Sequence, residues 1–451
     1  MARRTAAAIA WHGRVSVGTN EADVRRMANG ITRRSALVGL AASAAAATFG
    51  CARRNDDVLK FWAIGREGEV AGDLARDFMQ RHPDIRVEVQ KMPLTAAHEK
   101  LLTAYAGETL PDVCQIGNTW LAEFDELDAL EPLEDLIAAS SLPASDYFPA
   151  ILDSNRLKGR LVGLPWYVDT RLLFYRTDIL REAGFSEPPT TWDEWRETMA
   201  AIKKLVGPDR YAILMPINEY DQLVVLALQQ PGEMLRDRWR YGNFRSEDFR
   251  RAFSFYLEMF DRGWSPRMSN TQISNVWDEF GRGFYAYYLS GPWNIAEFML
   301  RLPAHLQDDW MTAPMPGPEG PGVSTAGGSS LVIFRSSRLK EQAWKFIEYL
   351  SSTETQRRFY QMTGDLPPRI GTWESPELVQ SPYARAFRAQ LERVRSPPRV
   401  PEWERIAQEI RLAQERVVLG AATLDEAVEA LDRKTDAILE KRRWMMDKER
   451  S

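Results

Sequence analysis

Trp293 stands directly after a break in an aromatic-rich part of the chain. Ser290, Gly291 and Pro292 form this break, and the residues after Trp293 have the composition of a helix. Proline is well tolerated at the first helical position, because its missing N–H would have no partner within the helix there. We therefore expect a strand to end at this corner and a helix to begin at Pro292. This would leave one face of the Trp293 ring free to stack on a flat ligand.

Metal and disulfide chemistry leave no clear trace in the sequence. The four histidines are His12, His82, His98 and His305. They lie far apart and show none of the short spacings that bind a metal. The two cysteines, Cys51 and Cys114, are too few for a disulfide framework. We expect no catalytic metal and no cofactor, and we expect Cys114 to be a buried thiol because it lies in an apolar stretch.

Length and charge limit the classes of protein to consider. At 451 residues the chain is long for one hydrophobic core, which favours two domains. The net charge is −5, and seven arginines fall within the first 50 residues, so the rest of the chain is more acidic. An acidic body without a basic stripe argues against nucleic acid as a partner. It suits a neutral or cationic solute better than an anionic one.

The N-terminal region has the pattern of an export signal followed by an anchor. Arg33 and Arg34 precede the modestly apolar run 36–49, which is short for a membrane-spanning helix. This pattern resembles a twin-arginine signal, although general secretion stays open, and Gly50–Cys51 resembles a lipoprotein cleavage site. We expect a signal region over 1–50 with a possible true start at Met27, a lipidated Cys51, and a tether over 51–57. The mature protein would then be extracytoplasmic and membrane-anchored, whereas the alternative is an ordinary N-terminal helix with a chance cysteine.

Strand and helix patterns alternate along the rest of the chain. Strand-like stretches cover 58–62, 85–89, 111–116, 161–175, 211–215 and 327–334. Helical spacing covers 70–79, 96–106, 339–351 and 423–443, and Thr191 can cap a further helix. Alternation of this kind favours an open α/β sheet, in which ligands bind at the carboxyl ends of the strands.

Five motifs, taken in order, resemble the carbohydrate-binding group of the solute-binding proteins of bacterial ABC importers, the group that includes maltose-binding protein. The motifs run from Asp112 to Leu133, from Gly163 to Tyr175, from Thr191 to Glu194, from Ser290 to Trp293, and from Gly327 to Ile347. The resemblance implies an α/β fold of two lobes joined by hinge strands. It also implies a monomer that binds a sugar or oligosaccharide between the lobes and delivers it to the importer's membrane permease subunits.

The resemblance also divides the chain. It implies that lobe 1 comprises residues 58–166 and 323–370, and that lobe 2 comprises 172–310 and 376–445. The hinges would then lie near 167–171, 311–322 and 371–375. Closure of the lobes around the ligand would present a surface to the importer.

Site residues follow from the same resemblance and from the chemistry of a sugar. Aromatic rings cover the C–H faces of a sugar ring, and charged or amide side chains bind its hydroxyl groups. The candidates are Arg66, Glu67, Asn118, Trp120, Asp169, Glu219, Tyr220, Trp293, Gly328, Arg369 and Trp403. For Asp169 the alternative is a salt bridge in the hinge, and Trp192, Trp195 and Trp344 are expected in the core instead.

Other functions stay open at this stage. A secreted carbohydrate-active enzyme is one alternative, because two carboxylates such as Asp169 and Glu219 could flank a glycosidic bond. A binding protein for a polyol or a glycerol phosphodiester is another, and a sensory module that reports ligand to a receptor is a third. The binding motifs favour a solute-binding protein without enzymatic activity.

Overall fold

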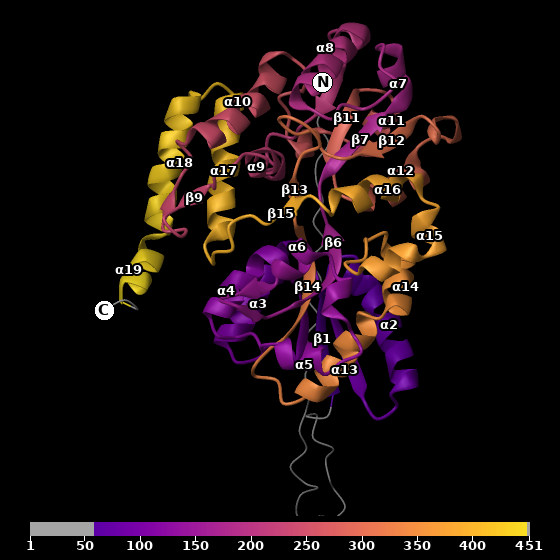
Figure 1. The fold of residues 1–451 in the computed structure, drawn as a ribbon, viewed down its shortest axis with the longest axis vertical. Coiled ribbons are helices and arrows are strands. Elements are labelled where there is room, and N and C mark those ends of the chain that lie inside the picture. The colour runs from indigo at the N-terminus through magenta and orange to yellow at the C-terminus, as the bar shows by residue number, and fades with distance from the viewer. Residues whose placement is uncertain (1–57, 449–451) are drawn as a thin grey trace, which may run out of the picture. The chain divides into compact units, whose positions relative to one another are not determined.

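The structure, a computed structural model, describes residues 58–448. Its strands form two principal sheets, and the chain passes between them repeatedly (Figure 1). We call the elements around the five-stranded sheet lobe 1 and those around the four-stranded sheet lobe 2. The fold is therefore of the mixed α/β, two-lobe type that the sequence predicts.

The sheet of lobe 1 has the strand order β2-β1-β3-β14-β6. Its strands are β1 (Val58–Ile64), β2 (Arg86–Met92), β3 (Val113–Gly117), β6 (Leu164–Asp169) and β14 (Gly327–Ile333). β1 pairs in parallel with β2 and β3, whereas β14 pairs antiparallel with β3 and β6. A strand from the late part of the chain therefore lies inside this sheet and joins the edge strand β6 to β3.

Helices and short elements complete lobe 1. The helices are α2 (Glu67–Arg81), α3 (Leu94–Ala106), α4 (Leu121–Glu126), α5 (Glu134–Ala138), α6 (Pro149–Asp153), α13 (Lys340–Leu350) and α14 (Thr353–Thr363). The short elements are η2 (Asn118–Trp120), η3 (Ala144–Asp146), β4 (Arg156–Leu157) and β5 (Arg160–Leu161). Phe61, Phe78, Trp166 and Phe346 are buried in one core between sheet and helices, and their rings contact one another.

The sheet of lobe 2 has the order β12-β7-β11-β8. Its strands are β7 (Leu172–Arg176), β8 (Tyr211–Leu214), β11 (Tyr285–Ser290) and β12 (Trp310–Ala313). β7 pairs antiparallel with β11 and β12, and β11 pairs in parallel with β8. Every residue of β7 and β11 is buried, which explains why both strands are apolar or aromatic up to their last residues, Arg176 and Ser290.

Lobe 2 has more helices than lobe 1. They are α7 (Thr177–Glu182), α8 (Trp192–Val206), α9 (Asp221–Leu228), α10 (Glu247–Asp261), α11 (Val276–Gly281), α12 (Trp293–Arg301), α15 (Pro376–Val379), α16 (Pro382–Gln390), α17 (Trp403–Val418), α18 (Leu424–Ile438) and α19 (Glu440–Lys448). The short elements beside them and at the crossings are β9 (Leu235–Arg236), β10 (Tyr241–Gly242), η4 (Asn270–Gln272), η5 (Ala304–Leu306), β13 (Ser324–Thr325), η6 (Ile370–Glu374) and β15 (Val394–Arg395). Thr191 and Glu194 form the expected capping box of α8. The paired helices α17 and α18 lie beside α10 (Figure 1).

The three expected hinge regions differ in their secondary structure. The extended run 161–175 consists of strands that belong to different sheets, because the chain leaves the first sheet after Asp169 and enters the second at Leu172. Residues 311–313 are not part of a loose connector, because they complete β12 and pair with β7. Residues 370–374 form the helical turn η6 rather than an extended hinge strand. The exact hinge positions stay predictions.

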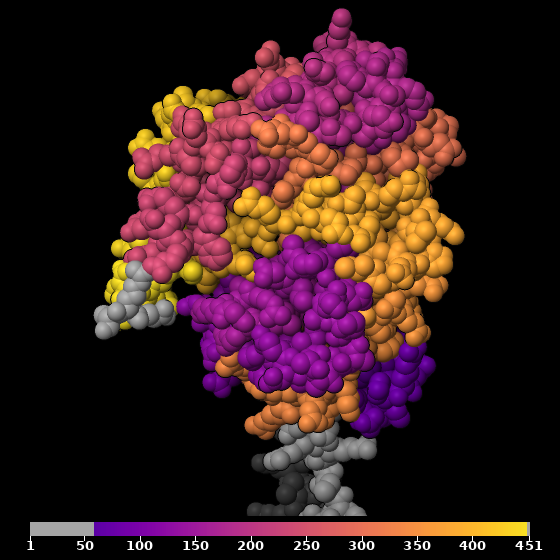
Figure 2. Space-filling model, in the orientation of Figure 1, coloured from indigo at the N-terminus to yellow at the C-terminus, as the bar shows by residue number. Residues whose placement is uncertain are grey.

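The late part of the chain lies between the two lobes on one face of the molecule (Figure 2). Trp310 of β12 stacks on Tyr383 of α16, with ring centroids 3.9 Å apart.

Cys114 is buried, as expected for a structural thiol, whereas Cys51 lies outside the described residues. Within residues 58–448 no helix combines the length and apolar character needed to cross a membrane.

Candidate functional site

The first crossing between the lobes places a charged turn between the two sheets. Asp169 is the last residue of β6, and Arg171 follows it before β7 begins. The backbone N–H of Arg171 donates to the Ser324 hydroxyl over 3.2 Å, and this hydroxyl donates to the Arg171 carbonyl over 2.6 Å. Because Ser324 belongs to the second crossing, each crossing fixes the position of the other.

The side chain of Arg171 lies beside two carboxylates and an aromatic ring. Its guanidinium lies 3.3 Å from Asp169, 3.4 Å from Asp221 at the start of α9, and 4.7 Å from the centre of the Trp293 ring. We call these four residues the arginine cluster. Burial acts to lower the pKa of Arg171, but the neighbouring carboxylates outweigh burial and raise it, so this guanidinium is charged.

Burial raises the pKa of Asp169, and the Arg171 guanidinium acts in the opposite direction. Asp169 therefore forms the hinge salt bridge that was its alternative interpretation. The same carboxylate remains about one-quarter exposed, so solvent and ligands can still reach it.

Trp293 lies where the sequence predicts it, at the corner between β11 and α12. Strand β11 ends at Ser290, Pro292 is the N-cap residue, and Trp293 is the first residue of α12. The ring packs so closely on Gly291 that any side chain at that position would overlap it. Trp293 is half-buried, with the Arg171 guanidinium over its ring.

Lobe 1 contributes a buried network of polar side chains. Glu67 opens α2, and its carboxylate contacts Asp365, Gln115 and Tyr167. Burial raises the pKa of Glu67, although the hydrogen bonds from its neighbours oppose this effect. The charge of Glu67 also raises the pKa of Asp169, so the network lies close to the arginine cluster.

Two contacts join loops of lobe 1 to helices of lobe 2. Arg66, just before α2, lies 3.7 Å from Glu297 of α12. The Thr119 hydroxyl of η2 donates to the Glu404 carboxylate at the start of α17. Polar groups from both lobes therefore meet at α12 and at the start of α17.

The remaining candidates of lobe 2 near α9 are Glu219 and Tyr220. The Glu219 carboxylate accepts hydrogen bonds from Asn270 over 3.0 Å and from Gln222 over 2.9 Å. Burial raises the pKa of Tyr220, whose half-buried ring packs against the core of lobe 2. Both residues directly precede Asp221, so they border the arginine cluster.

The loop after β3 holds the candidates Asn118 and Trp120. Asn118 accepts a hydrogen bond from Ser330 over 2.7 Å and donates to Ser154 over 3.4 Å, so both ends of its amide bind residues of lobe 1. Trp120 is half-buried, and its ring centre lies 4.9 Å from that of His98. Neither side chain contacts the arginine cluster among the interactions of the described residues.

Three further candidates have structural contacts, and Gly328 among them lies next to Asp169 of the arginine cluster. Gly328 pairs with Val168 in the sheet, and a side chain there would collide with the Tyr167 carbonyl. Arg369 is buried and bound to Asp146 over 2.8 Å. Trp403 is 1% exposed in the core of lobe 2. Each of them thus has structural contacts, and a binding role for each stays a prediction.

Sequence reasoning missed Arg171, Asp221 and Asp365. Asp221 directly follows Tyr220, and Arg171 lies two residues after Asp169, so both positions were a usable signal. Asp365 had no such signal, because its neighbour Glu67 is distant in sequence. In residues 58–448 no group of three or more histidine, cysteine or carboxylate side chains has the geometry to hold a metal ion.

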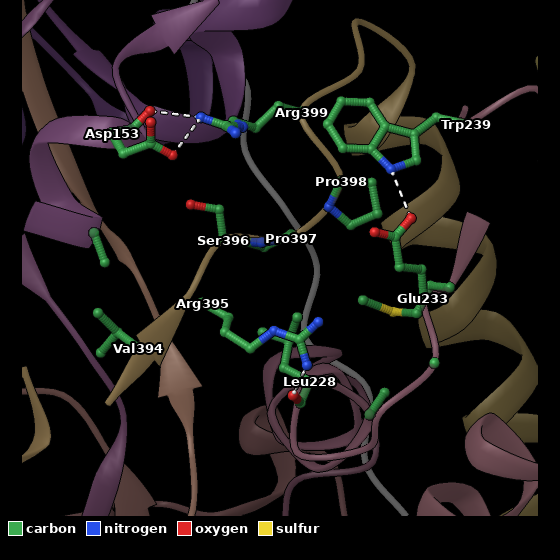
Figure 3. A pocket seen from close by; sticks show the side chains of 14 residues that line it. Asp153, Leu228, Glu233, Trp239, Val394, Arg395, Ser396, Pro397, Pro398 and Arg399 are labelled. Carbon is green, nitrogen blue, oxygen red and sulfur yellow. Dashed lines mark hydrogen bonds and ion pairs between the residues drawn. The ribbon is translucent and has the colours of Figure 1, made fainter. Parts of the chain in front are cut away.

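A separate pocket of about 240 Å³ lies around residues 394–399 and the ends of α6 and α9 (Figure 3). Arg399 binds the Asp153 carboxylate at its edge over 3.1 Å, and the indole N–H of Trp239 donates to Glu233 over 3.1 Å. No residue of the arginine cluster lines this pocket. The polar side chains that line this pocket therefore largely bind one another.

Comparisons with known proteins agree with the two-lobe fold. The model of the family described as bacterial extracellular solute-binding protein matches residues 73–386. The solved structure of the sugar-binding protein MalE from Xanthomonas citri is 56% identical, covers 86% of this chain and 99% of its own, and superposes with a TM-score of 0.84.

More distant relatives differ in ligand. The maltotriose-binding protein of Pyrococcus abyssi is 25% identical over 350 residues, which is 74% of this chain and 71% of that protein. The structure of UgpB from Mycobacterium tuberculosis in complex with glycerophosphocholine is 23% identical, covers 85% of this chain and 99% of its own, and has a TM-score of 0.72. This last likeness shows the fold alone.

Proposed function

We propose that the chain, which belongs to the bacterial extracellular solute-binding proteins, captures a sugar or oligosaccharide between its lobes and delivers it to an ABC importer. It is a solute-binding protein of the kind that serves ABC sugar importers. The choice of a particular ligand class and of particular binding residues depends on the geometry of the candidate site.

The arginine cluster carries the proposal. It brings an aromatic ring, a guanidinium and two carboxylates to one place between the sheets, from segments distant in sequence. A sugar needs this combination, because its C–H faces pack on rings and its hydroxyls bind charged groups. Glu67, Glu219, Tyr220, Arg66 and Trp120 would supply further contacts around it. The excess of carboxylates argues against an anionic ligand such as a phosphodiester.

A thermal-shift screen tests the proposal. The panel is maltose, maltotriose, diacetylchitobiose and glycerophosphocholine, with glycerol as the polyol control. A sugar at about 100 times its Kd should stabilise the protein by roughly 2.7 kcal/mol. Recovery of the sugar unchanged would support binding without chemistry, whereas hydrolysis would favour an enzyme. Stabilisation by glycerophosphocholine alone would contradict a sugar as the ligand.

The N-terminal assignments are part of the same proposal. Export through the signal at Arg33 and Arg34, and lipidation of Cys51, would hold a monomeric protein on the outer face of the cell membrane. These residues lie outside the described part of the chain. Intact-mass analysis of the membrane-extracted protein should show an acylated N-terminal Cys51. A mature protein that begins elsewhere would contradict this assignment.

A further inference from the structure

Asp365 and Glu67 bring two carboxyl groups together in the interior of lobe 1. Asp365 follows α14, where its backbone N–H donates to the Thr363 hydroxyl over 3.0 Å. The next residue, Leu366, bridges to Val168 of β6, so the chain holds Asp365 against the sheet. Asp365 is 7% exposed, and its carboxyl group lies within hydrogen-bonding reach of that of Glu67.

The hydrogen bonds around Glu67 form a chain in which each group donates to the next, and the Glu67 carboxylate is the last acceptor. The Gln115 amide donates to Ser329 over 3.3 Å, and the Ser329 hydroxyl donates to the Tyr167 oxygen over 3.1 Å. The Tyr167 O–H is then left to donate to Glu67, which it contacts. Glu67 is therefore the final acceptor of a chain of donors, which favours its ionised form.

A hydrogen bond between two carboxyl groups requires one proton. Two ionised carboxylates would repel each other, and among the ion pairs of the described residues none includes Glu67 or Asp365. Asp365 Oδ2 is buried, and no described N–H or O–H group donates to it. If Asp365 carries the proton, it becomes a donor to Glu67 and the contact between the two acids is satisfied.

We propose that Asp365 is a positioning residue of the binding site: as a neutral acid it donates a hydrogen bond to Glu67 and orients that carboxylate toward the ligand. The inference rests on the proposed function, since it assigns a regulated role to Glu67 in the same site. Loss of the Asp365 proton would set two negative charges side by side and displace Glu67. Sugar affinity should therefore fall in alkaline solution.

The charged and titratable groups that face Asp365 agree with this assignment. They are Glu67 of α2, and Tyr167 and Asp169 of β6, with the uncharged Thr363 of α14. Burial, followed by the charge of Glu67, raises the pKa of Asp365 well above its ordinary value. All three titratable neighbours are acids, so none of them stabilises an ionised Asp365.

Asp365→Asn is the central variant, because its amide keeps an N–H donor toward Glu67 but cannot lose a proton near neutral pH. Binding of maltose, and of maltotriose as a second probe, is measured by calorimetry from pH 6 to pH 9.5. We expect the wild-type affinity to fall roughly tenfold or more at the alkaline end, given the strength of hydrogen bonds to charged groups. Asp365→Asn should keep a constant affinity, within about threefold of the wild type at pH 7. Asp365→Ala should lose roughly tenfold at every pH.

The matched control is Asp84→Asn, a change at an exposed aspartate outside this network. It should keep the wild-type pH profile. An alkaline loss of the same size in Asp365→Asn would overturn the inference, whereas failure of the wild type to bind any sugar of the thermal-shift panel would instead contradict the proposed function.

Infrared difference spectra supply a reading that needs no ligand. A neutral carboxylic acid absorbs at a different infrared frequency from a carboxylate. At pH 7, the spectrum of the wild type minus that of Asp365→Asn should therefore show the band of one buried neutral acid. Absence of this band would overturn the inference whatever the sugars do.

Discussion

The guanidinium of Arg171 lies over the indole ring of Trp293, with its central carbon 4.7 Å from the ring centre. A cation in this position is attracted by the electrons of the ring face. The two carboxylates that bind Arg171 therefore also determine how the Trp293 ring is presented. A sugar that stacks on the Trp293 ring must either use a part of the ring that the guanidinium leaves exposed or displace the guanidinium.

Replacement of Trp293 by alanine tests the ring directly. Stacking of a flat ligand on an aromatic side chain is worth roughly 1–3 kcal/mol, by analogy with nucleic-acid bases. We expect Trp293→Ala to weaken sugar binding by roughly 10- to 100-fold while the melting temperature stays near that of the wild type. Calorimetry and a thermal melt on the same sample measure both. Trp195→Ala, at a fully buried core position, should instead lower the melting temperature.

Removal of Arg171 should leave two partly buried carboxylates without their partner. Breaking such a pair costs about 3 kcal/mol, and the pKa of Asp169 should rise further once the opposing guanidinium is gone. We expect Arg171→Met to be destabilised in urea unfolding, and more so at pH 8 than at pH 5. The double variant Arg171→Met with Asp169→Asn should recover part of the loss. Equal destabilisation of the single and double variants would contradict the pairing.

The stability of the protein should depend on pH through Asp365. Its pKa in the folded protein is above the unfolded value of about 3.9, so the folded state binds more protons between these two values. The free energy of unfolding contributed by this group is therefore highest in acid and falls as the pH rises through that window. Asp365→Asn cannot titrate there, so its stability relative to the wild type should increase from pH 4 to pH 8. A constant difference in denaturant unfolding would refute this expectation.

Gly291 should tolerate a side chain only when the Trp293 ring is absent. A methyl group at this position would overlap the ring, so Gly291→Ala should cost about 1–3 kcal/mol of stability. In the double variant with Trp293→Ala the overlap disappears. A double-mutant cycle by denaturant unfolding should show a favourable coupling between the two changes. Additive effects would mean that the backbone moves away instead.

The features that the sequence predicted correctly depend on neighbouring residues. The capping box of α8 needs only Thr191 and Glu194, and the corner before Trp293 needs only the preceding Pro292. The two-lobe fold and the family also follow from motifs that persist along the chain.

The features that could not be predicted depend on distant partners. Arg369 is buried because Asp146, 223 residues away, binds it, and Trp403 because helices close over it. The proton shared by Glu67 and Asp365 is likewise a property of two segments that meet only in the folded molecule.

The position of β14 has a consequence for the nascent chain. This strand lies between β3 and β6, yet the ribosome makes it after most of lobe 2. Until it emerges, β3 and β6 each have an unpaired strand edge that can join another chain. The first half of the protein is therefore open to incorrect strand pairing until β14 has left the ribosome.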